Sequence, residues 1–139
     1  LKEKKSGRVC LESGVLACQQ GDNEHRFRIS RPELWDAEHP NLYVLQVNVQ
    51  SADGGYSFER EIGFRKIEVK GDRMLVNGKQ VKLRGACRHD IHPTLGRTST
   101  PELDSLDAVL FKRANMNFVR TSHYPPTESF LIVTGKVFM

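Results

Sequence analysis

The sequence is poor in cysteine and contains no long hydrophobic run, and each absence excludes a class of protein. Its three cysteines lack C-x-x-C spacing, which argues against a zinc site and against a full disulfide framework. We expect buried free thiols, and a Cys10–Cys18 bridge across two strands is the alternative. No apolar run approaches the roughly 20 residues of a membrane helix, and no signal peptide is recognisable. The compartment, cytoplasmic or periplasmic, stays open.

Charge of one sign is only slightly in excess, and aromatic residues are few. The net charge is +4, and aromatic residues make up 8% of the 139 residues. The basic residues are scattered, without a basic stripe that carries interleaved aromatic side chains, so we expect no nucleic-acid partner. The proportions of hydrophobic (38%) and charged residues (27%) are typical of a globular chain. The chain does not begin with methionine, and we expect the natural start to lie upstream.

The first half of the chain has the period of β-strands. Apolar and polar residues alternate over residues 26–30 and again over 45–50, which predicts strands with one dry and one wet face. Asp53-Gly54-Gly55 predicts a turn before a further strand that carries Tyr56, Phe58, Ile62 and Phe64. Strands at this spacing are typical of an antiparallel sandwich. About four strands are too few to close one, so we expect earlier strands to be missing.

The middle of the chain predicts a β-hairpin. Asn77-Gly78 suits the two positive-φ positions of a type I′ turn, and it lies between apolar segments at 74–76 and 81–83.

The last third changes to a helical period. Thr100 is a good N-cap before Pro101, and Asn115 can end the helix in a left-handed conformation. A short strand at 117–120, a second helix from about Thr127 and a strand at 135–139 are predicted to follow. The first helix has one apolar face, formed by Leu103, Leu106, Leu110, Phe111 and Ala114.

This order of elements, strand–helix–strand–helix after antiparallel strands, favours a parallel sheet with right-handed crossovers. An eight-fold barrel needs roughly 250 residues. The residues from Gly71 onward hold about two of its repeats, so the barrel interpretation implies an incomplete barrel.

Two polar clusters follow predicted strands. Residues 88–92, Arg-His-Asp-Ile-His, come after a strand predicted at 81–86, and residues 120–124, Arg-Thr-Ser-His-Tyr, end the strand at 118–119. Active sites of parallel α/β folds form at the carboxyl ends of strands. Because neighbouring strands lie about 4.8 Å apart, the clusters should converge on one pocket.

Histidine and arginine in such a pocket suit a polyol substrate. A neutral imidazole donates or accepts a hydrogen bond, and a guanidinium presents a planar fork of donors. The ring of Tyr124 could pack on a sugar. Two alternatives stay open: structural ion pairs for Arg88 and Arg120, and a metal site at 89–92, although no H-E-x-x-H motif supports a metal. We expect His25 and His39 to be ordinary surface or sandwich residues and Trp35 to be a packing residue.

The carboxylates near these clusters do not form a complete hydrolytic site. Glycoside hydrolysis usually needs two carboxylates, about 5–5.5 Å apart for retention or 6.5–9.5 Å for inversion. Glu102 and Glu128 suit the first turns of the two helices, where they complement the helix dipole. Asp90 lies at the right end of a strand but has no evident partner.

Residues 117–125, Asn-Phe-Val-Arg-Thr-Ser-His-Tyr-Pro, closely resemble the signature of family 2 glycoside hydrolases. Residues 77–79 and 83–90 are similar to the start of that family's barrel, and His92-Pro93 with Gly96-Arg97 resemble its β-galactosidase branch. Upstream, segments at 34–35, 40–43 and 63–65 resemble the last strands of its immunoglobulin-like sandwich.

The resemblance implies that residues 1–70 are the C-terminal part of an immunoglobulin-like β-sandwich and that 71–139 begin a (β/α)₈ TIM barrel. It implies a retaining β-glycosidase whose acid/base and nucleophilic glutamates lie on later strands, outside this chain. The implied partners are a β-linked galactoside or related oligosaccharide, the rest of the parent chain and further copies in a homo-oligomer. It implies no cofactor here, and Mg²⁺ or Na⁺ in the parent enzyme. The resemblance implies that His89, Arg120 and His123 lie at the sugar site, and the polar clusters add Asp90 and Tyr124 as predicted substrate-binding residues.

Two segments depart from the family pattern. Ile91 stands where the β-galactosidase branch usually has another histidine, which bears on sugar specificity. The tail, 131–139, lacks the Cys-Asp-like pair that the family has there. A non-catalytic carbohydrate-binding or structural sandwich module is therefore the alternative function.

Overall fold

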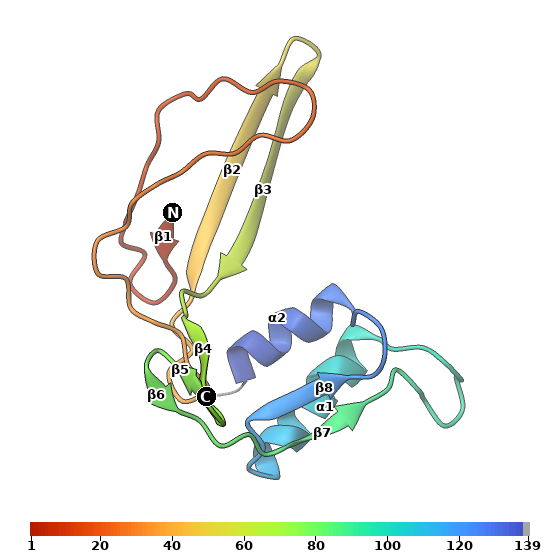
Figure 1. The fold of residues 1–139 in the computed structure, drawn as a ribbon. Helices are drawn as coiled ribbons and strands as arrows, with labels where there is room; N and C mark the ends of the chain where they lie inside the picture. Colours follow the sequence, from red (N-terminus) through yellow and green to blue (C-terminus); the bar gives the residue numbers. More distant parts are fainter. Residues whose placement is uncertain (138–139) are drawn as a thin grey trace. The chain divides into compact units, whose positions relative to one another are not determined.

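The computed structural model describes residues 1–137, and Figure 1 shows the order of their helices and strands. The chain divides into two compact units. The first unit joins Leu1–Trp35 with Asn41–Phe64, and the second joins Asp36–Pro40 with the chain from Arg65 onward. Each unit is described by itself.

The first unit contains one antiparallel sheet, in the order β1 (Lys2–Glu3), β2 (Tyr43–Ser51) and β3 (Gly54–Ile62). β2 and β3 form a long hairpin in which Val47 lies opposite Phe58, so the predicted strands and the turn between them are confirmed. The hairpin depends on the predicted alternation, because each strand has one face that can pack.

The core of the first unit lies at the start of β2. Tyr43 is 1% exposed and meets the ring of Phe64 edge to face, with the centroids 5.0 Å apart. Its hydroxyl accepts a hydrogen bond from the backbone N–H of Glu33 at 2.7 Å. The N–H of Trp35 donates to the carbonyl of Phe64 at 2.8 Å, and the Trp35 side chain lies against Gly63, in agreement with a packing role.

Two predictions for the first unit were wrong. Residues 26–30 are not a strand, and Phe27 is 50% exposed. An alternating pattern needs a neighbouring strand to take its hydrogen bonds, and within residues 1–137 no strand pairs with this segment. The cysteines are free as expected, yet Cys18 and Cys87 are exposed and Cys10 is half-buried, so they are not buried thiols.

The second unit begins with a three-stranded antiparallel sheet, β4 (Ile67–Lys70), β5 (Arg73–Val76) and β6 (Lys79–Gln80). Asn77 and Gly78 have φ of 52° and 79°, which confirms the predicted turn. β4 was not foreseen, and β6 ends before the apolar segment at 81–83 that was predicted to form it.

The side chain of Asn117 explains why the hairpin ends early. Its amide nitrogen donates to the carbonyl of Lys82 at 3.0 Å, and its Oδ1 accepts from the N–H of Arg84 at 2.8 Å. These bonds take the backbone groups of residues 82–84 away from the hairpin. The chain then continues into β7 (Gly85–Arg88), which replaces the strand predicted at 81–86.

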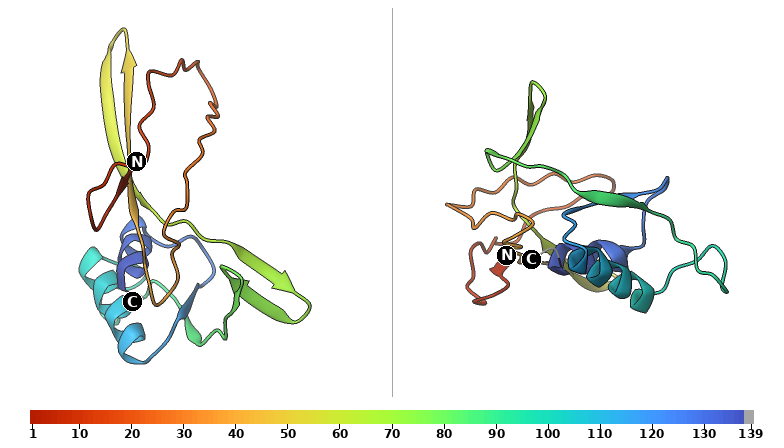
Figure 2. Two further views of the ribbon diagram at one scale, coloured as in Figure 1. Left: turned by 90° about the vertical axis from the view of Figure 1, so that its left-hand side faces the viewer. Right: turned by 90° about the horizontal axis from the view of Figure 1, so that it is seen from below.

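β7 pairs with β8 (Phe118–Thr121) in parallel, with Gly85 opposite Phe118 and Arg88 opposite Thr121. The helix α1 (Pro101–Arg113) connects the two strands, and α2 (Glu128–Val137) follows β8. The helices pack on each other beside the strand pair (Figure 2). In the described part of the chain this parallel sheet has two strands, so no barrel is closed.

The ends of α1 follow the sequence prediction. Thr100 is the N-cap, with its side-chain oxygen accepting from the N–H of Leu103 at 3.3 Å, and Pro101 is the first helical residue. Asn115, with φ of 55°, follows the helix in the left-handed conformation. The N-cap satisfies one of the unpaired amides of the first turn, so both boundaries have a local cause.

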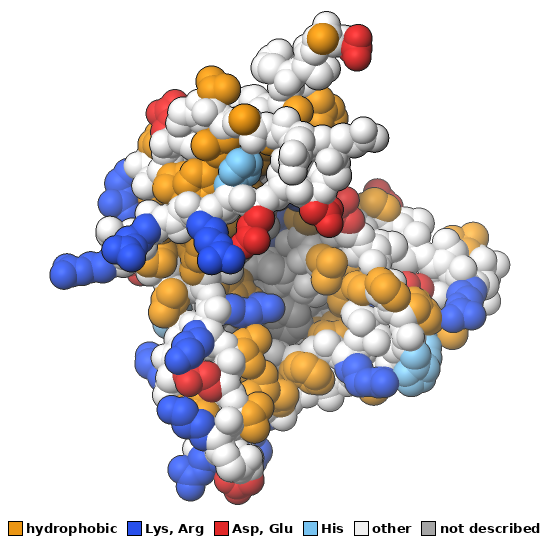
Figure 3. Space-filling model, turned by 45° about the horizontal axis from the view of Figure 1, so that its top comes forward, with side chains coloured by type: hydrophobic (Ala, Val, Ile, Leu, Met, Phe, Trp, Pro, Cys, Tyr) orange, Lys and Arg blue, Asp and Glu red, His pale blue; other side chains and the backbone are white. Residues whose placement is uncertain are grey.

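The predicted apolar face of α1 is only partly right. Asp104 and Ala108 are buried, whereas Leu106 and Leu110 are 53% and 49% exposed. The buried face of α1 is rotated relative to the predicted apolar face, because Asp104 and Asp107 both bind Arg88. Figure 3 shows apolar side chains left at the surface among charged ones.

α2 begins as predicted after Thr127, whose hydroxyl oxygen accepts from the N–H of Phe130 at 3.3 Å. The helix continues to Val137, so the strand predicted over residues 135–139 was wrong for 135–137, and 138–139 lie outside the described residues. Thr134 donates its hydroxyl to the carbonyl of Phe130 at 2.8 Å, within the helical ladder. Helical hydrogen bonds thus outweigh the penalty of about 1 kcal/mol for Gly135 inside a helix.

Gly85 is required for the parallel pairing. A Cβ at this position would lie 1.7 Å from the carbonyl oxygen of Phe118, which is backbone and cannot turn aside. We expect Gly85→Ala to destabilise the second unit by about 3 kcal/mol or more, at the upper end of overpacking costs. Gly135→Ala is the control, because a Cβ added at Gly135 would meet no neighbouring atom within 4 Å and alanine favours the helix. Urea denaturation followed by circular dichroism measures both, and equal stability of the two variants would contradict the pairing.

Candidate functional site

The two polar clusters meet at the carboxyl ends of β7 and β8. Arg88 and Thr121 are opposite each other in the parallel register, and a histidine follows each strand end. The rings of His89 and His123 lie edge to face, with centroids 5.4 Å apart and an interplanar angle of 80°. Both residues are exposed. The convergence predicted from the sequence is therefore confirmed, because parallel strands place their carboxyl ends at one edge.

Further hydrogen bonds connect the two strand ends. The N–H of Ser122, a residue 1% exposed, donates to the carbonyl of Arg88 at 2.8 Å. The N–H of Asp90 donates to the hydroxyl of Tyr124 at 2.9 Å. The guanidinium of Arg97 lies over the Tyr124 ring, 4.8 Å from its centroid. These contacts hold the segment after β7 against the segment after β8.

Arg120 lies opposite Cys87 in the register and contacts both Cys87 and Ser122. Its Nη1 donates to Ser122 Oγ at 3.1 Å and reaches Cys87 Sγ at 3.9 Å. The Ser122 hydroxyl and then the Arg120 guanidinium lower the pKa of the exposed Cys87 thiol. Arg120 is itself exposed, and in the described residues it forms no ion pair with a carboxylate. Its charge is available to an anionic neighbour.

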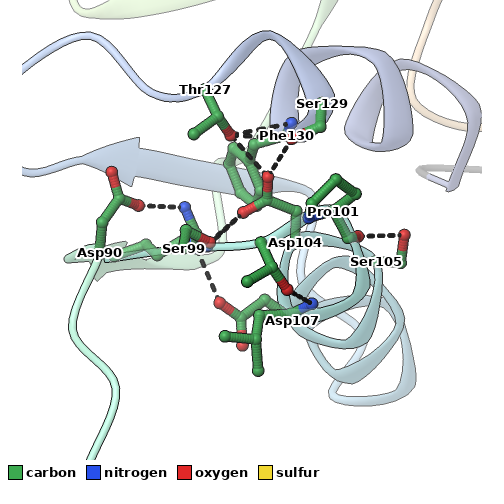
Figure 4. A network of polar contacts seen from close by, with 12 residues as sticks. Asp90, Ser99, Pro101, Asp104, Ser105, Asp107, Thr127, Ser129 and Phe130 are labelled. Atoms are coloured by element: carbon green, nitrogen blue, oxygen red, sulfur yellow. Dashed lines mark hydrogen bonds and ion pairs between the residues drawn. The ribbon is translucent and has the colours of Figure 1, made fainter. Parts of the chain in front are cut away.

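Arg88 is the centre of a buried polar network (Figure 4). Its Nε donates to Asp107 at 2.7 Å, its Nη1 to Asp90 at 2.5 Å and its Nη2 to Asp104 at 2.7 Å. The guanidinium also lies 4.1 Å from the centroid of the Phe130 ring. Burial opposes the charge, but Asp107, Asp90 and Asp104 together raise the pKa of Arg88. The structural ion-pair alternative is thus the right interpretation for this arginine.

Asp104 anchors the network from α1. Its side chain is 0% exposed, and besides Arg88 it accepts the hydroxyls of Ser99 (2.5 Å), Thr127 (2.5 Å) and Ser129. Burial alone would raise the pKa of Asp104, but the hydroxyls of Ser129, Ser99 and Thr127 and the charge of Arg88 outweigh burial and lower it. A buried carboxylate with this many donors stays ionised.

Sequence reasoning missed the aspartates of this network. Asp104 and Asp107 lie on the same helical face as Ala108 and Phe111, which a helical projection of the sequence would have shown. Two aspartates on the face that packs toward a strand-end arginine are the signal that could have identified the network. The hydroxyl partners come from distant segments and have no such signal.

The remaining candidates do not join the site. The Nδ1 atom of His92 contacts the hydroxyl of Thr94 at 3.1 Å, and Ile91 is 66% exposed. Among residues 1–137 no three His, Cys, Asp or Glu side chains gather closely enough for a metal ion. His92 therefore does not join His89 and Asp90 in a metal centre. Glu102 and Glu128 lie in the first turns of α1 and α2, and His25 and His39 are exposed, as expected.

Comparisons with known families match nearly the whole chain. The family model described as "Glycosyl hydrolases family 2" matches residues 1–65, and "Glycosyl hydrolases family 2, TIM barrel domain" matches residues 67–136. In the described residues no helix is both long and apolar enough to cross a membrane.

Curated relatives are β-galactosidases. The enzyme of Kluyveromyces lactis is 40% identical over 102 residues, which cover 72% of this chain and 10% of that protein. The enzyme of Photobacterium profundum is 43% identical over 101 residues, which cover 71% of this chain and 10% of that protein. The chain thus spans about a tenth of the length of these relatives.

Solved structures of similar fold include a β-glucuronidase and a β-galacturonidase. A β-glucuronidase of Parabacteroides merdae has a TM-score of 0.73 at 30% identity, covering 80% of this chain and 14% of that one. A β-galacturonidase from Eisenbergiella tayi, bound to galacturonate, has a TM-score of 0.71 at 33% identity, covering 78% of this chain and 20% of that one. With the family models, these structures fit a sandwich segment followed by an open part of a TIM barrel.

Proposed function

Because the chain belongs to glycoside hydrolase family 2, we propose that it is part of a longer retaining β-glycosidase that hydrolyses O-glycosidic bonds of β-galactosides. The observation that supports this most is the meeting of His89 and His123 at the carboxyl ends of two parallel strands. That edge is where barrel enzymes bind substrate.

In this proposal the two exposed imidazoles line the sugar site. An imidazole can donate to or accept from a sugar hydroxyl, and a contact that strengthens as the oxocarbenium-like transition state forms lowers the barrier. Arg120 lies on β8 shortly before His123, opposite Cys87 of β7, and has its charge available for the catalytic carboxylates. Its guanidinium would hold the pKa of such a carboxylate down and keep a nucleophile ionised.

Asp90 and Tyr124 complete the proposed substrate-binding set. Asp90 Oδ1 is held by Arg88, which leaves Oδ2 as the atom for a sugar hydroxyl. Tyr124 accepts from the N–H of Asp90, and its own hydroxyl proton remains to donate. Both residues would therefore bind substrate with atoms whose positions the protein has already fixed.

The two catalytic glutamates belong, in this proposal, to later strands outside these residues. Retention needs two carboxylates about 5–5.5 Å apart. Near the imidazoles, Asp90 is engaged in an ion pair with Arg88, and Glu102 and Glu128 lie in helix first turns. The use of Mg²⁺ or Na⁺ by the parent enzyme stays a prediction.

Hydrolysis of chromogenic glycosides tests the proposal. We expect the full-length protein that contains these residues to hydrolyse a nitrophenyl β-galactoside and to retain the anomeric configuration. The 139-residue chain alone should not turn it over. A nitrophenyl β-glucuronide is the comparison substrate, because two solved relatives are a β-glucuronidase and a β-galacturonidase.

Each outcome decides something specific. Preference for the glucuronide would overturn the galactoside assignment but leave the β-glycosidase. No turnover of either substrate, with sugar still bound in calorimetry, would favour the non-catalytic carbohydrate-binding module. Turnover by the 139-residue chain itself, abolished by Asp90→Asn, would contradict the placement of the catalytic glutamates elsewhere.

A further inference from the structure

We propose that Arg88 is a positioning residue for the sugar site, which holds both imidazoles in place and does not touch substrate. This inference rests on the proposed function for its meaning in catalysis. The contacts of Arg88 do not depend on that function, because they are features of the fold of the second unit.

Arg88 is fixed in three directions. Its three guanidinium nitrogens each meet a different carboxylate, at 2.5 to 2.7 Å, and Nη2 also donates to Ser99 Oγ at 3.0 Å. Two of the carboxylates come from α1 and one from the segment after β7. The side chain of Arg88 is only 5% exposed, so water does not readily replace its buried partners Asp90 and Asp104. Its planar fork is pre-organised for this arrangement, and lysine has no equivalent.

Both ends of Arg88 lead to the imidazoles. Its carbonyl accepts from the N–H of Ser122, the residue before His123. His89 follows Arg88 directly in the chain. The Nη1 atom of Arg88 binds the carboxylate of Asp90. Asp90 in turn donates its N–H to Tyr124, the residue after His123. Each histidine is thus flanked by residues that Arg88 holds directly or through Asp90.

Asp107 supplies the matched control. Asp107 binds Arg88 Nε at 2.7 Å, so this ion pair is as short as the pair with Asp104. Both aspartates lie on α1, but the side chain of Asp107 is 39% exposed and that of Asp104 is 0% exposed. Water can replace Asp107, while Asp90 and Asp104 still hold the other end of the guanidinium. If the network served only stability, the activities of Arg88→Lys and Asp107→Asn would fall in proportion to the loss of folding free energy in each variant. If Arg88 has a positioning role, Arg88→Lys should disturb the imidazoles much more than Asp107→Asn does, beyond the difference in stability.

The first test needs no turnover. In proton–carbon NMR spectra of the 139-residue chain, we expect Arg88→Lys to move the imidazole signals of His89 and His123. The signals of His25 and His39 serve as internal references, because these residues are exposed and have no contact with Arg88. Asp107→Asn should move the His89 and His123 signals far less than Arg88→Lys does. If Arg88→Lys does not fold, Asp90→Asn, which weakens one pair at nearly constant volume, should move the His89 signal.

The second test uses the full-length protein and the chromogenic galactoside. We expect Arg88→Lys to lower kcat about 10- to 100-fold with little change in KM, since misplacing reacting groups by about 1 Å costs this much. In an His123→Ala background the same change should have a much smaller effect, because both act through one site. Asp107→Asn should lower kcat far less than Arg88→Lys, because Asp90 and Asp104 still hold the guanidinium.

The outcomes separate the two proposals. Unmoved His89 and His123 signals, or equal movement in Asp107→Asn, would overturn the positioning role whatever the enzyme does. Full independence of Arg88→Lys and His123→Ala in kcat would overturn it as well. Moved signals in a protein that hydrolyses no glycoside would uphold the geometric inference and refute the proposed activity.

Discussion

Replacing Asp104 by alanine is expected to destabilise the second unit by about 3–5 kcal/mol, the usual cost of breaking a buried ion pair. The variant leaves the buried guanidinium of Arg88 short of one carboxylate. It also removes the acceptor for the hydroxyls of Ser99, Thr127 and Ser129. The cost is large because these donors have to find new partners away from water.

The two units allow this loss to be measured separately. Both helices of the described residues belong to the second unit, so far-ultraviolet circular dichroism in urea reports mainly on it. The fluorescence of Trp35, the one tryptophan in the sequence, reports on the first unit and should be unchanged. Asp107→Ala is the control, with an expected loss near 1 kcal/mol because the pair is partly exposed. Equal losses in the two variants would show that Asp104 is not the anchor.

Acid adds a second measurement of the same network. The pKa of Asp104 is lowered in the folded protein, so its contribution to stability is complete above the pKa of an unfolded aspartate, about 3.9. It is lost as the pH falls below that value through the folded pKa. Asp104→Asn should remove this part of the acid dependence, and an unchanged slope below about pH 4 would contradict the expectation.

The second large effect concerns His123. In the full-length protein, His123→Ala is expected to lower kcat/KM for the chromogenic galactoside by about 10² to 10⁴-fold, the range for a lost group that stabilises the transition state. His89→Ala should have a similar effect. Because the two rings are in contact, the double variant should lose less than the product of the single losses.

A control comes from the first unit. His25 is exposed and belongs to the other unit, so His25→Ala should keep wild-type kcat and KM. Thermal denaturation of all variants checks that the second unit is intact. Wild-type activity in a folded His123→Ala variant would refute the placement of the sugar site at these strand ends.

The comparison of sequence and structure shows which local signals sufficed. The Asn77-Gly78 turn, the Thr100 cap and the left-handed Asn115 were predictable because each depends on a few neighbouring residues. The strand predicted at 26–30 failed because an alternating pattern does not show whether a partner strand is present. The shift of β7 to Gly85–Arg88 depended on Asn117, which is more than thirty residues from the backbone groups it binds.

The sequence by itself determined the family pattern, the strand–helix–strand–helix order of β7, α1, β8 and α2, and the two histidines that follow parallel strands. These features depend on motifs and on periodicity, and both are properties of a few neighbouring residues. Only the tertiary structure decided the role of Arg88, the burial of Asp104 and the rotation of α1. An arginine at a strand end has the same local pattern whether it faces a ligand or a buried carboxylate. Long-range packing, which brings Asp104 and Thr127 to it, decides between the two.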